Sequence, residues 1–297
     1  MKRVLIFGSS HAIAISQLIS SENKENKFIL NSLSIGEGAL NNLTIDNGRL
    51  ITKADFKRDR EKKLWDEFLN KNSNELIQYD LFILVGALNP LSPFLYFSKD
   101  LDEVPLISES IINDILVANC ITEYSDKCLS RDSNNIYNIF SKFINAISNC
   151  KIILVPSPLV HEKIMDLVSL PSFVQLSSYN IHKIKFLTNP SEETIIKCNK
   201  FTERVRYVFD NIQPLENVRV FIPPTKLLDK SGLFTSSEYT LFHNAFNIKT
   251  HNMDYIHVDT NYYLKGGFLD FINRALTQNG LKSNRICPGT AEETHRV

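Results

Sequence analysis

Ser10, Asp254 and His257 carry the three side-chain types that together can make a serine nucleophilic. A hydroxyl is a poor nucleophile at neutral pH, so it needs a base such as histidine within hydrogen-bond reach and a carboxylate that holds this base in the right tautomer. Ser10 lies in "VLIFGSSHAIAIS" at the start of the chain, whereas Asp254 and His257 stand three apart in "MDYIHVDTNYYLKGG" near its end. The residue types alone indicate little, because a chain of 297 residues contains many of each.

The stretch around Ser10 has other interpretations. Lys2 and Arg3 precede an apolar run, as they do in a secretory signal. The run Val4–Phe7 gives only four apolar residues before Gly8, whereas a signal needs roughly seven. A glycine turn that leads into a helix can bind phosphate, yet "GSSHAI" has neither the glycines of a dinucleotide fingerprint nor the Gly-Lys-Ser/Thr of a P-loop. Ser10 can also cap the first helix, a role that serine often fills.

The order of the motifs resembles that of the SGNH (GDSL-like) hydrolase superfamily. Its members begin with a strand that leads into Gly-x-Ser, here Gly8-Ser9-Ser10, and they end with Asp-x-x-His, here Asp254-Tyr255-Ile256-His257. The subset that begins Gly-Asn-Ser-His is the most similar, with Ser9 in place of the asparagine. Between the motifs, "SIGEGAL" stands where the family has its glycine block and "DLFILVGALNP" where it has Gly-x-Asn, so the resemblance spans nearly the whole chain.

The resemblance implies a serine hydrolase, an esterase that forms an acyl-enzyme intermediate. Ser10 would attack the ester carbonyl, and His257 would take its proton and later activate water. Asp254 would orient the imidazole and stabilise its cation. The oxyanion hole would consist of the Ser10 backbone N–H, the N–H of Gly36 and the side chain of Asn89.

Two positions depart from the family's pattern. Asn89 lies three residues after Gly86, where the family places its asparagine two residues after the glycine. Asn89 also precedes Pro90, so a turn is its alternative role. The glycine block offers both Gly36 and Gly38, and Gly36 is preferred because it lies nearer the preceding strand.

Two other classes of protein stay open on the same fold. An O-acyltransferase would pass the acyl group to a bound sugar hydroxyl, and a non-catalytic module would bind a glycan or a partner. The substrate itself is only weakly indicated. Tyr262 and Tyr263 could stack on sugar rings, which favours a carbohydrate-linked acyl ester, or they could belong to the core and rim of the last helix. The oligomeric state is open.

The composition indicates a soluble chain without a net electrostatic charge. It is 43% hydrophobic and 22% charged, and 33 basic residues balance 33 acidic ones, so no overall charge attracts nucleic acid or an anionic membrane and a charged partner must be recognised locally. The five cysteines are an odd number without metal-like spacing, which indicates a reducing compartment. We therefore expect a cytoplasmic protein that keeps its N-terminus and has no cofactor or metal. His11 is expected to be a local structural or substrate-side group, and four histidines show no ligand spacing: His161, His182, His243 and His251.

Short apolar runs alternate with amphipathic ones, which is typical of an α/β fold. The predicted strands are Arg3–Gly8, Lys27–Leu30, Asp80–Gly86, Lys151–Pro156 and Val218–Ile222. Helices are predicted from apolar stripes near the helical period, at Leu64, Trp65, Phe68 and Leu69, at Phe201, Val205, Val208, Phe209 and Ile212, and at Leu264, Phe268, Phe271 and Ile272. The mixed charges of "KRDREKK", Lys57 to Lys63, favour a solvated helix start over a binding patch.

These elements predict a three-layer α/β/α flavodoxin-like sandwich around a parallel sheet of roughly five strands. One SGNH-like hydrolase domain is expected over residues 1–282, with Ser125–Asn135 and Leu170–Asn180 as loop or cap insertions, and residues 283–297 are expected to form a flexible tail. In such a sheet the ligand site lies beyond the carboxyl ends of the strands. Ser10 follows the first predicted strand at that position.

Overall fold

A parallel sheet lies at the centre of the molecule. In the computed structural model its five strands are β1 (Lys2–Gly8), β2 (Phe28–Ser34), β5 (Leu81–Ala87), β6 (Lys151–Pro156) and β7 (Val218–Val220). The structure describes residues 1–23, 28–35, 37–40, 42–87, 146–147, 150–156, 158, 192, 196, 217–221, 223–230, 232, 234–239 and 258–277.

The strand order of this sheet is β2-β1-β5-β6-β7, and every described pairing is parallel. Counted along the sheet alone, the order is 2-1-3-4-5, which is that of flavodoxin-like doubly wound sheets. The predicted α/β fold with a five-stranded parallel sheet is confirmed.

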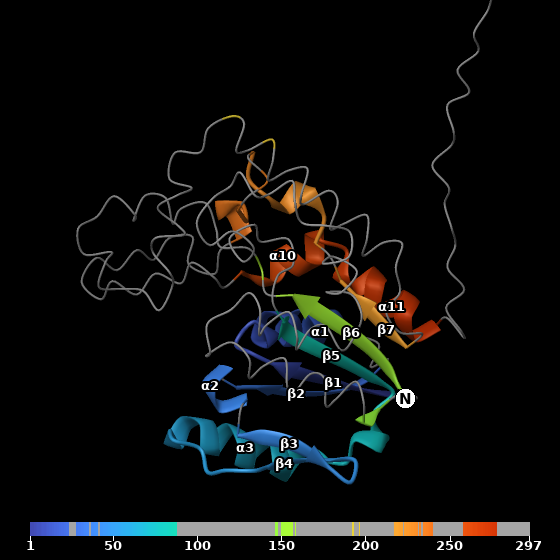
Figure 1. Cartoon of the computed structure of the whole chain (residues 1–297). Helices are drawn as coiled ribbons and strands as arrows, with labels where there is room; N and C mark the ends of the chain where they lie inside the picture. The colour runs from blue at the N-terminus through green and yellow to red at the C-terminus, as the bar shows by residue number, and fades with distance from the viewer. Residues whose placement is uncertain are drawn as a thin grey trace, which may run out of the picture.

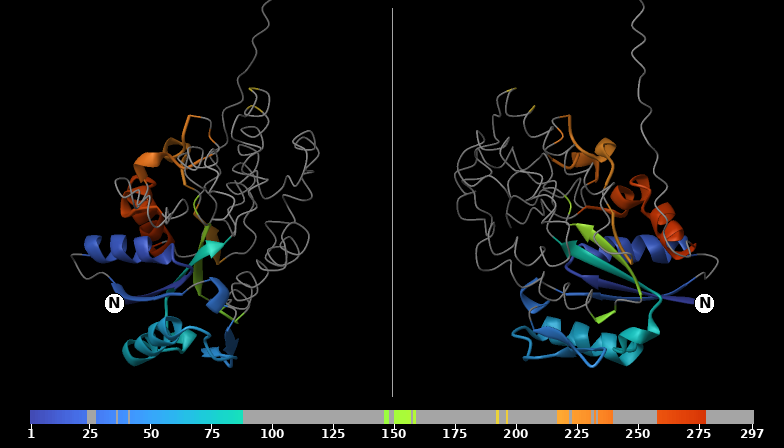
Figure 2. Two further views of the ribbon diagram at one scale, coloured as in Figure 1. Left: turned by 90° about the vertical axis from the view of Figure 1, so that its left-hand side faces the viewer. Right: turned by 45° about the vertical axis from the view of Figure 1, so that its right-hand side comes forward.

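Helices and a hairpin cover the two faces of the sheet (Figure 1, Figure 2). One face carries α1 (Ala12–Glu22), α10 (Thr260–Lys265) and α11 (Phe268–Thr277). The opposite face carries α2 (Glu37–Leu40), the antiparallel pair β3 (Leu43–Asp46) and β4 (Arg49–Thr52), and α3 (Asp59–Lys71). Single turns of 3-10 helix are η1 (Leu76–Gln78), η5 (Thr225–Leu227) and η6 (Ser237–Tyr239).

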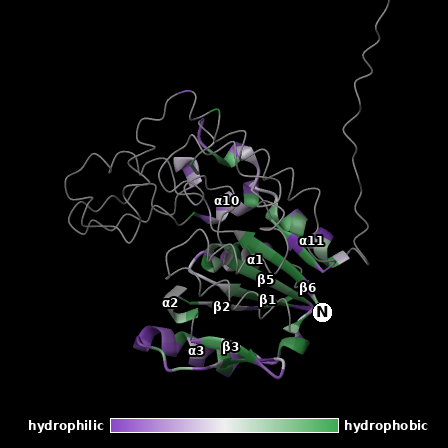
Figure 3. Ribbon diagram, in the orientation of Figure 1, coloured by the Kyte–Doolittle hydropathy of each residue, from purple (hydrophilic) through white to green (hydrophobic). Residues whose placement is uncertain are grey.

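β1 is buried on both faces, which explains its unbroken apolar run. Val4 and Ile6 pack on the α1 side of the sheet, whereas Leu5 and Phe7 pack on the α3 side, because successive side chains of a strand point to opposite faces. None of the four is more than 1% exposed, and the burial of each contributes about 1.5–3 kcal/mol to folding. Figure 3 shows the hydrophobic colour gathered in β5 and β6 and the hydrophilic colour on α3.

The predicted strands are all present, and β6 has the predicted bounds. β2 continues to Ser34, beyond the predicted Lys27–Leu30, through the polar residues Asn31 and Ser32. The extension is possible because β2 is the terminal strand of the described sheet and because the Asn31 side chain donates a hydrogen bond to the Tyr79 hydroxyl at 2.9 Å. Because Asn31 and Ser32 interrupt the apolar run, the sequence pattern predicted only the first part of the strand.

The hairpin of β3 and β4 was not predicted. Asn47 and Gly48 join the two strands with positive φ values of 47° and 72°, as in a type I′ turn. An Asn-Gly pair is the strongest short-range sequence signal for such a hairpin, so this element could have been found.

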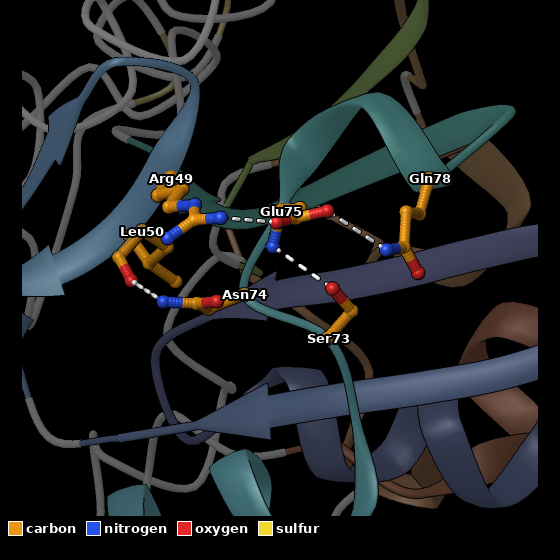
Figure 4. Close-up of polar contacts among 6 residues, drawn as sticks. All are labelled: Arg49, Leu50, Ser73, Asn74, Glu75 and Gln78. Atoms are coloured by element: carbon orange, nitrogen blue, oxygen red, sulfur yellow. Dashed lines mark hydrogen bonds and ion pairs between the residues drawn. The ribbon is translucent and has the colours of Figure 1, made fainter.

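Polar contacts fasten the hairpin to the segment before β5 (Figure 4). The Leu50 N–H donates to the Asn74 carbonyl at 2.9 Å, and the Asn74 side chain donates back to the Leu50 carbonyl at 3.1 Å. Arg49 pairs with Glu75, which also accepts a hydrogen bond from Gln78. The Gln78 hydrogen bond and then Arg49 lower the pKa of Glu75, so this carboxylate stays ionised.

The predicted helical patterns are partly correct. In α3, Trp65 and Phe68 are buried as predicted, but Leu69 is exposed. The stripe from Leu264 to Ile272 belongs to two helices, because Gly267 takes a left-handed φ of 77° between α10 and α11. Leu264 therefore lies on the exposed side of α10.

Several predictions lie outside the described residues: the stripe from Phe201 to Ile212, the insertions Ser125–Asn135 and Leu170–Asn180, and the tail at 283–297. Within the described part of the chain, no helix has the length and apolar character to cross a membrane.

Asp80 clamps the start of β1 to the start of β5. Its carboxylate accepts hydrogen bonds from the Arg3 N–H at 2.8 Å and from the Lys2 ammonium at 3.0 Å. Its own N–H donates to the Arg3 carbonyl at 2.9 Å. Burial raises the pKa of Asp80, but the Arg3 hydrogen bond, the Lys2 hydrogen bond and the nearby positive charges together set the pKa below the usual 3.8.

We expect Asp80→Asn to lower the free energy of unfolding by less than about 1 kcal/mol at neutral pH, because solvent screens this exposed pair. A carboxyl whose folded pKa is depressed stabilises the fold above its unfolded pKa, and this contribution disappears as the pH falls through the folded pKa. Urea unfolding of both proteins from neutral to acid pH should show the difference shrinking as the pH falls. A difference that grows toward acid pH would contradict this role.

Candidate active site

The chain passes from β1 into α1 through a short turn at Ser9 and Ser10. The Ser9 N–H still belongs to the sheet, since it donates to the Val85 carbonyl of β5 at 3.0 Å. The Ser9 carbonyl then accepts the Ala12 N–H at 3.0 Å, and the Ser10 carbonyl accepts the Ile13 N–H at 3.2 Å. Ser10 therefore stands just beyond the strand, at the N-terminal end of α1.

Two glycines allow β1 and β5 to approach each other at this turn. Gly8 has a φ of 154°, and a Cβ at this position would lie 1.9 Å from the Val85 carbonyl oxygen. Gly86 has a φ of 98°, and a Cβ there would lie 2.2 Å from Ser9 Oγ. Either side chain would force the two strands apart, so the place of Ser10 depends on both glycines.

The two serines of the turn differ in their access to solvent. Ser9 is 1% exposed, and its Oγ lies against Gly86 without a hydrogen-bond partner among the described residues. Ser10 is partly exposed and lines a groove. Of the two hydroxyls, that of Ser10 is the one a substrate can reach.

Ser10 also lies where the strand order reverses. β1 has β2 on one side and β5 on the other, and in sheets of this order ligands bind outside the carboxyl ends of the strands at this switch point. The N-terminus of a helix carries a partial positive charge that stabilises negative charge beside it. An oxyanion formed at Ser10 would lie close to this end of α1.

The other predicted site residues, His257, Asp254, Asn89 and Gly36, lie outside the described residues. The structure neither brings them to Ser10 nor separates them from it. Gly38, the alternative to Gly36, lies in α2.

The structure places the neighbours of two of these residues. Ile35, the residue before Gly36, donates its N–H to the Gly8 carbonyl at 3.0 Å. Val258, the residue after His257, is buried in the core on the α1 side of the sheet. The chain next to each predicted residue therefore belongs to the layers that position Ser10.

Asp259 links the end of the Asp-x-x-His motif to α10. Its N–H donates to the Tyr239 carbonyl at 2.8 Å, and its side chain caps the helix by accepting the Tyr262 N–H at 3.2 Å. α10 packs on α1, the helix that begins beside Ser10. Figure 1 shows both helices on the same face of the sheet.

The tyrosines of this region belong to the core. Tyr262 and Tyr263 are 1% and 0% exposed, so of the two predicted roles the core packing applies and neither ring face is open to a sugar. Burial raises the pKa of Tyr263 well above 10.0, and a hydrogen bond with Glu238 followed by burial raises the pKa of Tyr239 to about 12. These phenols stay protonated and do not act as bases. His11 is buried.

A groove of about 750 Å³ is lined by Ser10 and by residues of β2. Residues Leu30 to Ile35 line it from the sheet, Ile13 lines it from α1, and the α3 region lines it from Arg58 to Asn72. Sequence reasoning missed this groove. The charged run Lys57 to Lys63 is largely solvated as predicted, but Arg58, Arg60 and Glu61 also border the groove, and nothing in the run itself indicates what lies beside it.

We expect Gly8→Ala to lower the free energy of unfolding by more than about 2 kcal/mol, because the added Cβ collides with backbone and the left-handed φ is strained. Gly48→Ala is the matched control. Gly48 has a φ of 72° but nothing within 4 Å of the added Cβ, so this change should cost only the backbone term of about 1 kcal/mol. Urea unfolding measures both, and equal losses would contradict the close approach of β1 and β5.

No protein-family model matches this sequence, and no curated protein matches it. Among solved structures the chain is similar to the lipopolysaccharide acetyltransferase periplasmic domain of Salmonella ser. Paratyphi A. The sequence identity is 13% and the TM-score 0.34, over 92% of this chain and 84% of that chain. A likeness at this level carries no inference from that protein to the chemistry of this one.

Proposed function

We propose that this protein is a serine esterase of the SGNH type, with Ser10 as its nucleophile. The observation that carries the proposal is the position of Ser10. It follows β1 at the switch point of the sheet, stands at the N-terminal end of α1, and opens onto a groove. A nucleophile at the carboxyl edge of a parallel sheet meets its substrate where such folds bind ligands.

In the proposed reaction, Ser10 Oγ attacks the carbonyl carbon of an acyl ester. His257 takes the hydroxyl proton, and Asp254 stabilises the imidazolium. The bond between Oγ and the acyl carbon forms, the ester C–O bond breaks, and His257 returns its proton to the leaving alcohol. Water, deprotonated by His257, then cleaves the acyl-enzyme and restores the Ser10 hydroxyl.

The negative charge of the tetrahedral intermediate needs fixed donors. The Ser10 N–H, the N–H of Gly36 and the Asn89 side chain are proposed to supply them, and the partial positive charge of the α1 N-terminus adds to their effect. The Ile35 N–H donates a hydrogen bond to the Gly8 carbonyl, so the residue before Gly36 lies beside the strand end that leads into Ser10. This placement supports a glycine N–H as the second donor.

The first test combines p-nitrophenyl acetate hydrolysis with labelling by a fluorophosphonate probe. Ser10→Ala and His257→Ala are each expected to lower kcat by more than about a thousandfold and to abolish labelling. Peptide mapping of the labelled wild type should place the adduct on Ser10, since Ser9 is buried.

Ser21→Ala is the matched control. Ser21 lies in the same helix, where its hydroxyl bonds to the Leu18 carbonyl, and its loss should leave activity and labelling intact. An adduct on any serine other than Ser10, or full activity in Ser10→Ala, would reject the proposed nucleophile.

A second test concerns the oxyanion hole. Asn89→Ala is expected to lower kcat by about 10²–10³-fold with little change in KM, because the lost hydrogen bond forms only in the transition state. Steady-state kinetics on p-nitrophenyl acetate measure the split. If KM rises while kcat is unchanged, Asn89 holds the ground-state substrate and the proposed oxyanion role is wrong.

A further inference from the structure

β2 is the terminal strand of the described sheet, and one of its edges faces away from β1. Ile35 N–H bonds to the Gly8 carbonyl, so the backbone groups of residue 35 point toward β1. Adjacent residues of a strand direct their N–H and C=O to opposite sides. The backbone groups of Phe28, Leu30, Ser32 and Ser34 therefore point away from the sheet.

The backbone of Phe28, the first of these outward-pointing residues, already forms hydrogen bonds with a side-chain amide. The Asn23 side chain donates to the Phe28 carbonyl at 2.8 Å and accepts the Phe28 N–H at 3.4 Å. These are the two bonds that the N–H and the C=O of one residue on an antiparallel neighbouring strand would make. The outer edge of β2 thus pairs with an amide within this chain, and it continues beyond Asn23 at Leu30 and Ser32.

The groove follows this same edge. Leu30, Ser32, Ser34 and Ser10 line it, and the Ser34 hydroxyl donates to the Ser9 carbonyl at 3.0 Å. A ligand that satisfies the outward N–H and C=O groups needs donors and acceptors that repeat about every 6.7 Å along its length. An extended peptide has this repeat, because every second residue of a strand offers both groups on one side.

The side walls of the groove agree with a peptide better than with a glycan. Sugar rings are held by exposed aromatic faces, but the aromatic residue among those lining the groove, Phe68, is 3% exposed. The α3 wall carries ionic groups instead. In the described part of the chain Glu61 pairs with Arg58 and Glu67 with Lys63, which leaves the charges of Arg60 and Lys71 to a ligand.

We propose that an extended peptide binds this groove as an added strand on β2, with acidic side chains toward α3, and that the ester cleaved at Ser10 is carried on a hydroxyl side chain of such a peptide. The docking stands on the geometry of β2 alone, whereas the ester step rests on the proposed function. In that step the peptide hydroxyl is the leaving alcohol, which receives the proton that Ser10 gave up.

The docking is tested by fluorescence anisotropy with the full chain and a fluorescein-labelled heptapeptide of alternating Thr and Glu. Two further probes carry N-methyl groups, one on the Thr residues and one on the Glu residues. Only one set of N–H groups can face β2, so one methylated probe should bind like the parent and the other at least about tenfold more weakly. Absence of binding by the parent, or equal binding of both methylated probes, would overturn the docking.

Ser32→Pro tests the strand itself. Proline removes the outward N–H of residue 32 and is tolerated on the free edge of a sheet, while the inward bonds of the neighbouring residues remain. Circular dichroism should show an intact fold, and parent binding should weaken by about tenfold or more. Ser32→Ala keeps the N–H and should bind like wild type. If size-exclusion chromatography instead shows that wild type dimerises and Ser32→Pro does not, while neither binds the peptide, a second copy occupies the edge and the proposal fails.

The substrate class has its own readout. Acetate release from the heptapeptide with a central O-acetylthreonine is compared with release from N-acetyl-O-acetylthreonine methylamide, and the longer substrate should have at least about a tenfold higher kcat/KM. Equal values, or faster release from an acetylated xylo-oligosaccharide, would reject the peptide substrate even where p-nitrophenyl acetate is cleaved. If p-nitrophenyl acetate is not cleaved at all, the esterase function fails, and the anisotropy results still decide the docking.

Discussion

The close approach of β1 to β5 at their carboxyl ends is the constraint on which the candidate site depends. Gly8 and Gly86 leave no room for a Cβ between the strands, and the Ser9 N–H completes the contact with Val85. Because Ser9 is still tied to β5, the chain must turn at once to begin α1. Ser10 is therefore the first residue beyond the sheet, and it is partly exposed whereas Ser9 is buried.

The rest of the fold keeps this turn rigid. β1 is buried by two separate cores, one under α1, α10 and α11 and one under α3 and the β3–β4 hairpin. β1 is held from both faces and by two neighbouring strands, and Gly8 at its end adopts a positive φ of 154° without steric penalty because it has no Cβ. The site thus combines a glycine turn with a well-packed support.

The sequence was sufficient for the elements that depend on local pattern. The apolar runs of β1, β5 and β6 predicted buried parallel strands, and the structure has them. β2 was cut short because Asn31 and Ser32 are polar, and their tolerance depends on the edge position and on Tyr79, which is distant in sequence. The hairpin at Asn47 and Gly48 had a local signal that was overlooked, whereas the groove had none, since it arises where β2 and α3 meet in space.

The site residues divide in the same way. Ser10 could be placed from sequence because it follows a strand directly, and a strand fixes the residue at its end. The proposed partners His257 and Asn89 lie outside the described residues, and a spacing rule locates them along the chain but not in space. The family resemblance supplied their roles, and Val258, the described residue next to His257, belongs to the core.

Among the described residues, the outer edge of β2 pairs with no further strand. An exposed strand edge usually invites aggregation, and proteins limit this with short edges, charge and polar residues. Here Asn23 occupies the start of the edge, Ser32 and Ser34 keep its open part polar, and the ionic wall of α3 flanks it. Such an edge buries little apolar surface when it pairs, so binding rests on backbone hydrogen bonds that each contribute about 0.5–1.5 kcal/mol. A peptide bound by such hydrogen bonds can dissociate, as a reaction product must do to free the active site.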